Sequence, residues 1–149
     1  MIDSTTSPSC YHPPTGILES VLYCDDLEAC GWFYEEVIGL SLISSQLGRH
    51  RFYQLGHSML LIFCRKATMS DEVKVGGETI PKHGTRGEGH LAFSTPPEAA
   101  AAIRDRLQSF GIQIEAEIPW PGGGLSIYCR DPAGNSIEFA TPKIWFREM

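Results

Sequence analysis

The chain carries the same order of predicted elements twice, and this repeat limits the folds open to it. Two stretches of roughly fifty residues each predict a strand, an amphipathic helix and three short strands. The alternating run ILESVLYC opens the first stretch, and EGHLAFS opens the second. A βαβββ unit covers one face of its sheet with its helix and leaves the other face bare until a second unit joins it. The sequence therefore predicts an α+β fold in which two tandem βαβββ modules form a curved mixed sheet around a cleft.

The segments outside the two repeated units divide the chain into an arm, two modules joined by a linker, and a tail. Proline, serine and threonine without periodicity predict a flexible arm before the first strand, and a polar, glycine-containing stretch between the modules predicts a linker or mobile loop. The predicted parts are the N-terminal arm (1–15), a single domain (16–142) made of module one (16–65), the linker (66–86) and module two (87–142), and a C-terminal tail (143–149).

Charge and composition exclude several classes of partner. Twelve basic residues stand against eighteen acidic ones, and the net charge of −6 disfavours nucleic acid. No run of about eighteen apolar residues and no secretory leader is present, so we expect no membrane partner and a cytoplasmic protein. The five cysteines are odd in number and lack a CxxC spacing, which favours buried, reduced thiols over disulfides or zinc ligands.

Side chains alternate across a strand, so each predicted strand has two distinct faces. One set is apolar and suited to packing under the helices: Leu18, Leu22, Cys24, Leu91, Phe93, Ile127, Cys129, Ile137 and Phe139. The opposite, more polar set holds Glu19, His90 and Glu138. Two carboxylates and an imidazole suit a divalent ion such as Mn²⁺, Fe²⁺, Ni²⁺ or Zn²⁺, with positions left open for a substrate. Taken singly, each of the three is more often a solvent-facing strand residue.

The segments LYCDDLEACGWFYEEVIGL and YCRDPAGNSIEF, together with the paired βαβββ modules, resemble the vicinal oxygen chelate superfamily over residues 16 to about 142. This group includes glyoxalase I, extradiol dioxygenases, fosfomycin-resistance enzymes and bleomycin-resistance proteins. The resemblance implies a glyoxalase-like fold, a small-molecule substrate, a homodimer, and metal ligands at Glu19, His90 and Glu138. It also implies a fourth ligand position in glyoxalases, where the overlay of the modules places Leu60.

Other residues enter through the same resemblance or through their position. Tyr128 matches a tyrosine that similar fosfomycin enzymes direct into their site, and with Glu138 it is a candidate catalytic residue. A sheet aromatic that supports the fold is an equal interpretation of Tyr128. Arg147 on the tail could reach an anionic substrate, and Trp120 and Trp145 could wall the pocket, although a solvated arginine and ordinary packing explain them at least as well. Three further histidines, His12, His57 and His83, are expected to be exposed to solvent.

Two functions follow from these expectations. The first is a metal-dependent enzyme that acts on a small molecule with vicinal oxygens, as a lyase, an isomerase or epimerase, or a dioxygenase. The alternative is a metal-free binding protein of the bleomycin-resistance type, which would sequester a drug or metabolite in the same cleft. In the alternative, Glu19 and Glu138 only line the cleft.

Overall fold

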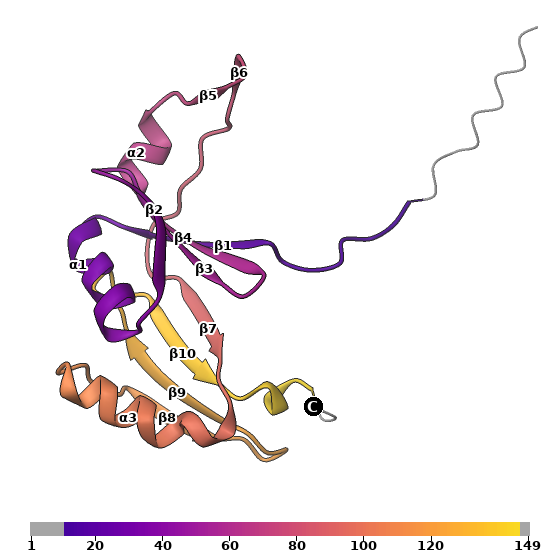
Figure 1. Ribbon diagram of the computed structural model, residues 1–149, viewed down its shortest axis with the longest axis vertical. Helices are drawn as coiled ribbons and strands as arrows, with labels where there is room; N and C mark the ends of the chain where they lie inside the picture. Colours follow the sequence, from indigo (N-terminus) through magenta and orange to yellow (C-terminus); the bar gives the residue numbers. More distant parts are fainter. Residues whose placement is uncertain (1–10, 147–149) are drawn as a thin grey trace, which may run out of the picture.

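The computed structural model describes residues 11–146, and the predicted α+β architecture is confirmed (Figure 1). Module one contains β1 (Glu19–Cys24), α1 (Leu27–Trp32), a π-helical turn η1 (Phe33–Val37), β2 (Ser41–Gln46), β3 (His50–Leu55) and β4 (Ser58–Cys64). Its sheet has the order β1-β4-β3-β2, with β1 parallel to β4 and the other pairs antiparallel.

Module two repeats this topology. It contains β7 (His90–Ser94), a short 3₁₀ turn η2 (Pro97–Ala99), α3 (Ala100–Ser109), β8 (Ala116–Pro119), β9 (Leu125–Arg130), β10 (Ser136–Ala140) and a final 3₁₀ turn η3 (Pro142–Ile144). The sheet order is β7-β10-β9-β8, again with the first strand parallel to the last. Both modules are therefore βαβββ units with one and the same strand order.

Local sequence explains where the first helix begins and ends. Asp26 caps α1, because its Oδ1 accepts a hydrogen bond from the backbone N–H of Ala29 at 3.0 Å. The helical turn continues as η1 and stops before Gly39, whose φ of +85° is a conformation that glycine adopts without strain. The predicted stop at this glycine is therefore confirmed.

The segment between the modules contains more regular structure than the sequence indicated. It begins with α2 (Arg65–Ser70) and continues with a small hairpin of β5 (Lys74–Val75) and β6 (Glu78–Thr79). Figure 1 shows α2, β5 and β6 at the end of module one that lies away from module two. Thr68 in α2 is buried, and its carbonyl oxygen accepts a hydrogen bond from the N–H of His83 at 3.4 Å. The second half of the segment is thereby tied back to α2.

One apolar core extends through both modules. It comprises Leu22, Cys24, Leu27, Cys30, Phe33, Tyr34, Val37, Tyr53, Leu60, Ile62, Phe93, Leu107, Ile127, Cys129, Ile137 and Phe139. The predicted apolar set belongs to this core or packs against it, with Leu18 as the exception. Leu18 is 72% exposed, because it precedes the first residue of β1 and no other element covers it. The cysteines described are all free thiols.

The turn that joins β9 to β10 holds the two modules together. Asp131 is buried, and its Oδ2 accepts a hydrogen bond from the hydroxyl of Tyr34 in module one at 2.7 Å. Asn135 accepts from the N–H of Gly89 at 2.7 Å and donates to the carbonyl oxygen of Tyr23 at 3.3 Å. The end of β1 and the start of β7 are thus fixed to one turn.

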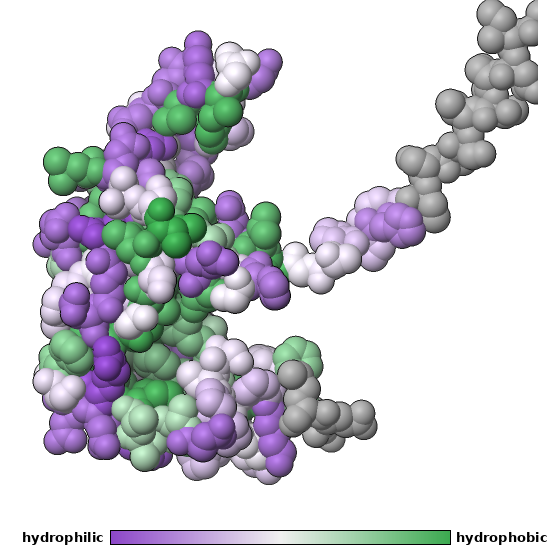
Figure 2. All heavy atoms as spheres, in the orientation of Figure 1, coloured by the Kyte–Doolittle hydropathy of each residue, from purple (hydrophilic) through white to green (hydrophobic). Residues whose placement is uncertain are grey.

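The surface is mixed in character, with apolar patches at the outer edge of module one. All six residues of β2 are exposed, Ile43 by 55%, and apolar atoms are visible in this part of the surface in Figure 2. Within residues 11–146, no helix is long and apolar enough to cross a membrane.

Candidate functional site

Two of the three predicted ligands meet on the polar face of module two. His90 begins β7 and is paired in register with Ser136, and Glu138 lies two residues further along β10 on the same face. This diagonal relation brings Nε2 of His90 within 3.2 Å of Oε2 of Glu138. The carboxylate side chain is only 7% exposed, whereas the imidazole is 53% exposed. The carboxylate of Glu138 is therefore buried, while the imidazole of His90 is open to solvent.

The other ring nitrogen of His90 decides what Nε2 can do. Nδ1 lies 3.0 Å from the carbonyl oxygen of Ser136. A carbonyl oxygen only accepts hydrogen bonds, so Nδ1 must carry the proton, and in the neutral imidazole Nε2 then has a lone pair. That lone pair faces a carboxylate oxygen, which also has only lone pairs to offer. A proton between the two atoms, on either group, or a cation must therefore hold them together.

A chain of hydrogen bonds orients the carboxylate of Glu138. The indole N–H of Trp120 donates to Oγ of Ser126 at 2.8 Å, so the hydroxyl proton of Ser126 is directed to its other neighbour. That neighbour is Oε1 of Glu138, with which Ser126 makes a short hydrogen bond. Oε2 is left to face His90. The arrangement matches the way that neighbouring hydrogen bonds orient ligands in metal sites.

Tyr128 lies beside the pair on β9, directly opposite Glu138 in the antiparallel register. Its ring is stacked against that of His90, with 6.3 Å between centroids and 24° between planes. Partial burial is the main cause that raises the pKa of Tyr128 above its ordinary value, and the neighbouring Glu138 adds to this effect. Tyr128 is therefore a neutral phenol at physiological pH and can donate a hydrogen bond to a ligand at this face.

Glu19, the third predicted ligand, stands at the first residue of β1 and is exposed. Among residues 11–146, no group of three or more His, Cys, Asp or Glu side chains is placed to hold a metal ion. A single copy of the chain thus offers two prospective ligands, His90 and Glu138, on one module and Glu19 on the other. The role of Glu19 stays a prediction.

The strand register corrects the position of the fourth slot. Glu19 pairs with Met59 in module one as His90 pairs with Ser136 in module two, so the counterpart of Glu138 is Leu61. The overlay of the two module sequences indicated Leu60 as this counterpart. Leu60 belongs to the apolar core, whereas Leu61, on the other face of β4, does not. The overlay was wrong by one residue because it aligned the turns rather than the paired strands. Leucine occupies both positions, so the slot has no ligating side chain.

His83 was expected to be exposed, and the structure places it on module one instead. Its Nδ1 lies 2.6 Å from the hydroxyl oxygen of Tyr23, and its ring contacts that of Phe63 edge-on at 5.0 Å. Nothing in the local sequence indicates this contact, which joins residues sixty positions apart. Trp145 is 79% exposed, and Arg147 lies outside the described residues.

The two donors that meet on this face, His90 and Glu138, are of types that divalent ions accept. A neutral imidazole with a free Nε2 and an oriented carboxylate are ligands that Mn²⁺, Fe²⁺, Ni²⁺ and Zn²⁺ all accept. The open side of the pair leaves room for further ligands.

Comparison with known proteins identifies the family of the chain. The family model described as the Glyoxalase/Bleomycin resistance protein/Dioxygenase superfamily matches residues 16–139. A crystal structure of a lactoylglutathione lyase from Agrobacterium tumefaciens is 36% identical, with a TM-score of 0.83 over 90% of this chain and 98% of that one.

More distant relatives share the fold. A virulence protein of Salmonella typhimurium is 28% identical over 123 residues, which are 80% of this chain and 79% of the relative. A fosfomycin resistance protein of Listeria monocytogenes, crystallised with Mn(II) and 1S,2S-dihydroxypropylphosphonic acid, is 20% identical, with a TM-score of 0.64 over 88% of this chain and 94% of that one. The family model covers both modules, and this chain therefore belongs to the glyoxalase/bleomycin resistance protein/dioxygenase superfamily.

Proposed function

We propose that this protein is a metal-dependent enzyme that acts on a small molecule with two neighbouring oxygen atoms. The observation that carries the proposal is the facing of Nε2 of His90 and Oε2 of Glu138 at 3.2 Å, with the proton of the imidazole directed to the Ser136 carbonyl. A divalent ion satisfies two such lone pairs at once. Their fixed orientation lowers the cost of binding the ion.

The third ligand, in this proposal, is Glu19 of a second copy of the chain. His90 and Glu138 lie on module two, and Glu19 lies exposed at the start of module one, where it makes no contact with that pair. A homodimer that places module one of one copy over module two of the other would complete the set twice. The active unit is then the dimer.

A bound divalent ion would hold both substrate oxygens and stabilise negative charge on them. The residues of the chain supply the rest. Tyr128, a neutral phenol beside His90, donates a hydrogen bond to the substrate, and Glu138 accepts a proton from it. These roles suit lyase, isomerase, epimerase or dioxygenase chemistry. The names of the similar proteins make lactoylglutathione and 1S,2S-dihydroxypropylphosphonic acid the first ligands to test.

One observation favours the alternative of a metal-free binding protein. A second proton on His90 would turn the same contact into an imidazolium–carboxylate ion pair that needs no metal. The missing side-chain ligand at Leu61 points the same way. In that case the face binds its ligand by shape and hydrogen bonds alone.

Metal titration separates the two functions. Protein freed of metal is titrated with Mn²⁺, and bound ion is followed by electron paramagnetic resonance and by the shift in melting temperature. We expect one ion per subunit, and a loss of affinity of about a hundredfold or more in Glu138→Gln, since a ligand is removed. Glu78→Gln, on the exposed β6, is the matched control and leaves binding unchanged.

Mixed dimers test the shared site. If Glu19 and His90 come from different copies, a mixture of Glu19→Ala and His90→Ala subunits regains one intact site per mixed dimer, whereas each variant alone has none. Failure of the mixture to regain binding would exclude the shared site. Absence of any Mn²⁺ binding in the unmodified protein would overturn the enzyme proposal in favour of the binding protein.

A further inference from the structure

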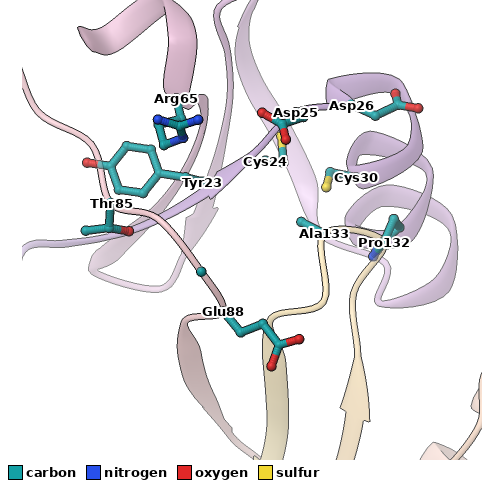
Figure 3. A pocket seen from close by; sticks show the side chains of 11 residues that line it. Tyr23, Cys24, Asp25, Asp26, Cys30, Arg65, Thr85, Glu88, Pro132 and Ala133 are labelled. Atoms are coloured by element: carbon teal, nitrogen blue, oxygen red, sulfur yellow. The ribbon is translucent and has the colours of Figure 1, made fainter.

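A hollow lies where the two modules and the inter-module segment meet, and neither His90 nor Glu138 lines it (Figure 3). It encloses about 350 Å³, which is in the range of small-molecule sites. Its walls are formed by the end of β1, the first part of α1 with its cap, the first residue of α2, the turn between β9 and β10, and Thr85, Gly87 and Glu88. Elements of both modules are therefore needed to build it.

The guanidinium of Arg65 lines this hollow without an oxygen partner. In residues 11–146, its one hydrogen bond goes to the sulfur of Met69 at 3.6 Å, a weak acceptor. Most other arginines of the chain donate to carboxylates or carbonyl oxygens; Arg51 and Arg130 are examples. The unused donors of Arg65 are thus available to a ligand.

The stem of Arg65 is held in place by a close approach of the backbone. A Cβ added to Gly84 would lie 2.6 Å from Cγ of Met69 and 3.1 Å from Cγ of Arg65. Only glycine lets residues 83–85 pass so close to α2. The first carbons of the Arg65 side chain are therefore packed against residue 84, and its guanidinium lies at the wall of the hollow.

A carboxylate without a partner lies on a neighbouring wall. Asp25 makes no side-chain hydrogen bond or ion pair within the described part of the chain, and it does not pair with Arg65. The other two acidic residues of the hollow are engaged, because Asp26 caps α1 and Glu88 pairs with Arg130 at 3.2 Å. The hollow therefore presents one unpaired cation and one unpaired anion.

We propose that this hollow binds a zwitterionic small molecule of the α-amino acid class. The carboxylate of the ligand accepts hydrogen bonds from Arg65, and its ammonium group donates to Asp25. Asp26 and Glu88 are already engaged, so the two charged groups left to a ligand are Arg65 and Asp25, and a molecule that carries both charges complements both. Pro132 and Ala133 offer a small apolar wall for its side chain. The site needs neither a metal nor the cleft.

Calorimetric titration with matched ligands tests this assignment. The proteinogenic amino acids are titrated into the full-length protein, and the best binder is compared with its amide, which lacks the carboxylate, and its N-acetyl derivative, which lacks the ammonium group. We expect each modification to weaken binding by about tenfold or more, because each removes a charge-assisted hydrogen bond. No binding by any amino acid at about 10 mM, or equal binding of all three forms, overturns the proposal.

Variants locate the site. Arg65→Met and Asp25→Asn are each expected to weaken binding by about tenfold or more, while the exposed charges Lys74→Gln and Asp105→Asn, which lie outside the hollow, leave it unchanged. Gly84→Ala, which displaces the stem of Arg65, is expected to weaken binding with the guanidinium still present. Binding that survives both Arg65→Met and Asp25→Asn in folded protein places the ligand elsewhere and overturns the assignment.

Discussion

Replacement of Tyr34 by phenylalanine removes a single hydroxyl from the junction of the modules. That hydroxyl donates to Oδ2 of Asp131 at 2.7 Å. Tyr34 is fully buried, and Asp131 is only 5% exposed. Asp131 keeps three other donors, namely the side-chain amide and N–H of Asn135 and the N–H of Ala133. The variant therefore weakens the solvation of a buried carboxylate without leaving it bare.

A hydrogen bond to a buried charged group contributes about 1.5–3 kcal/mol. The remaining donors around Asp131 keep the expected loss in that range, and because the ring stays and only one hydroxyl is vacated, the cavity contribution is small. Urea unfolding followed by tryptophan fluorescence measures the difference as a lower midpoint at an unchanged slope.

Tyr53→Phe is the matched control. The hydroxyl of Tyr53 donates to Glu35 at 2.9 Å, but this carboxylate is 26% exposed and also pairs with Arg51. Water can take over the lost bond, so we expect a smaller loss, of about 0.5–1.5 kcal/mol. A loss in Tyr34→Phe no larger than that in Tyr53→Phe would refute the argument that Asp131 anchors the junction.

Two further results are expected. Ser126→Ala removes the hydroxyl that orients Oε1 of Glu138, so we expect Mn²⁺ affinity, measured by electron paramagnetic resonance, to fall by about 10- to 100-fold. An unchanged affinity would contradict the orienting role of the Trp120–Ser126–Glu138 hydrogen bonds. Burial raises the pKa of Cys129 from its ordinary value to about 12, so the folded protein keeps a proton that the unfolded chain loses above about pH 9. This thiol should therefore make the free energy of unfolding fall by up to about 1.4 kcal/mol for each pH unit above about pH 9. Urea unfolding at a series of alkaline pH values should show a flatter decline in Cys129→Ala than in the unmodified protein. Equal slopes in the two proteins would contradict this expectation.

The repeat in the sequence was sufficient for the fold because strand and helix periodicities are local. The stop at Gly39 and the buried positions of Ile127 and Ile137 follow from patterns only a few residues long. The parity of the strands likewise brought His90 and Glu138 to one face, and the structure places their side chains in contact.

Contacts between distant segments could not be predicted in this way. The bond between His83 and Tyr23 depends on the path of the inter-module segment, which has no periodic pattern. The error at Leu60 had another cause, since a one-residue difference in turn alignment reverses the face of a strand. The close packing of Gly84 against Met69 and Arg65 is likewise not indicated by the sequence.

The contact between Nδ1 of His90 and the carbonyl oxygen of Ser136 has a consequence for how such a site can evolve. The acceptor belongs to the backbone and is present in every amino acid, so no side-chain substitution at position 136 deletes it. The β7–β10 pairing itself therefore fixes the tautomer of the imidazole. Substitutions at positions 19, 61 or 128 therefore leave this acceptor, and with it the protonation of Nδ1, unchanged.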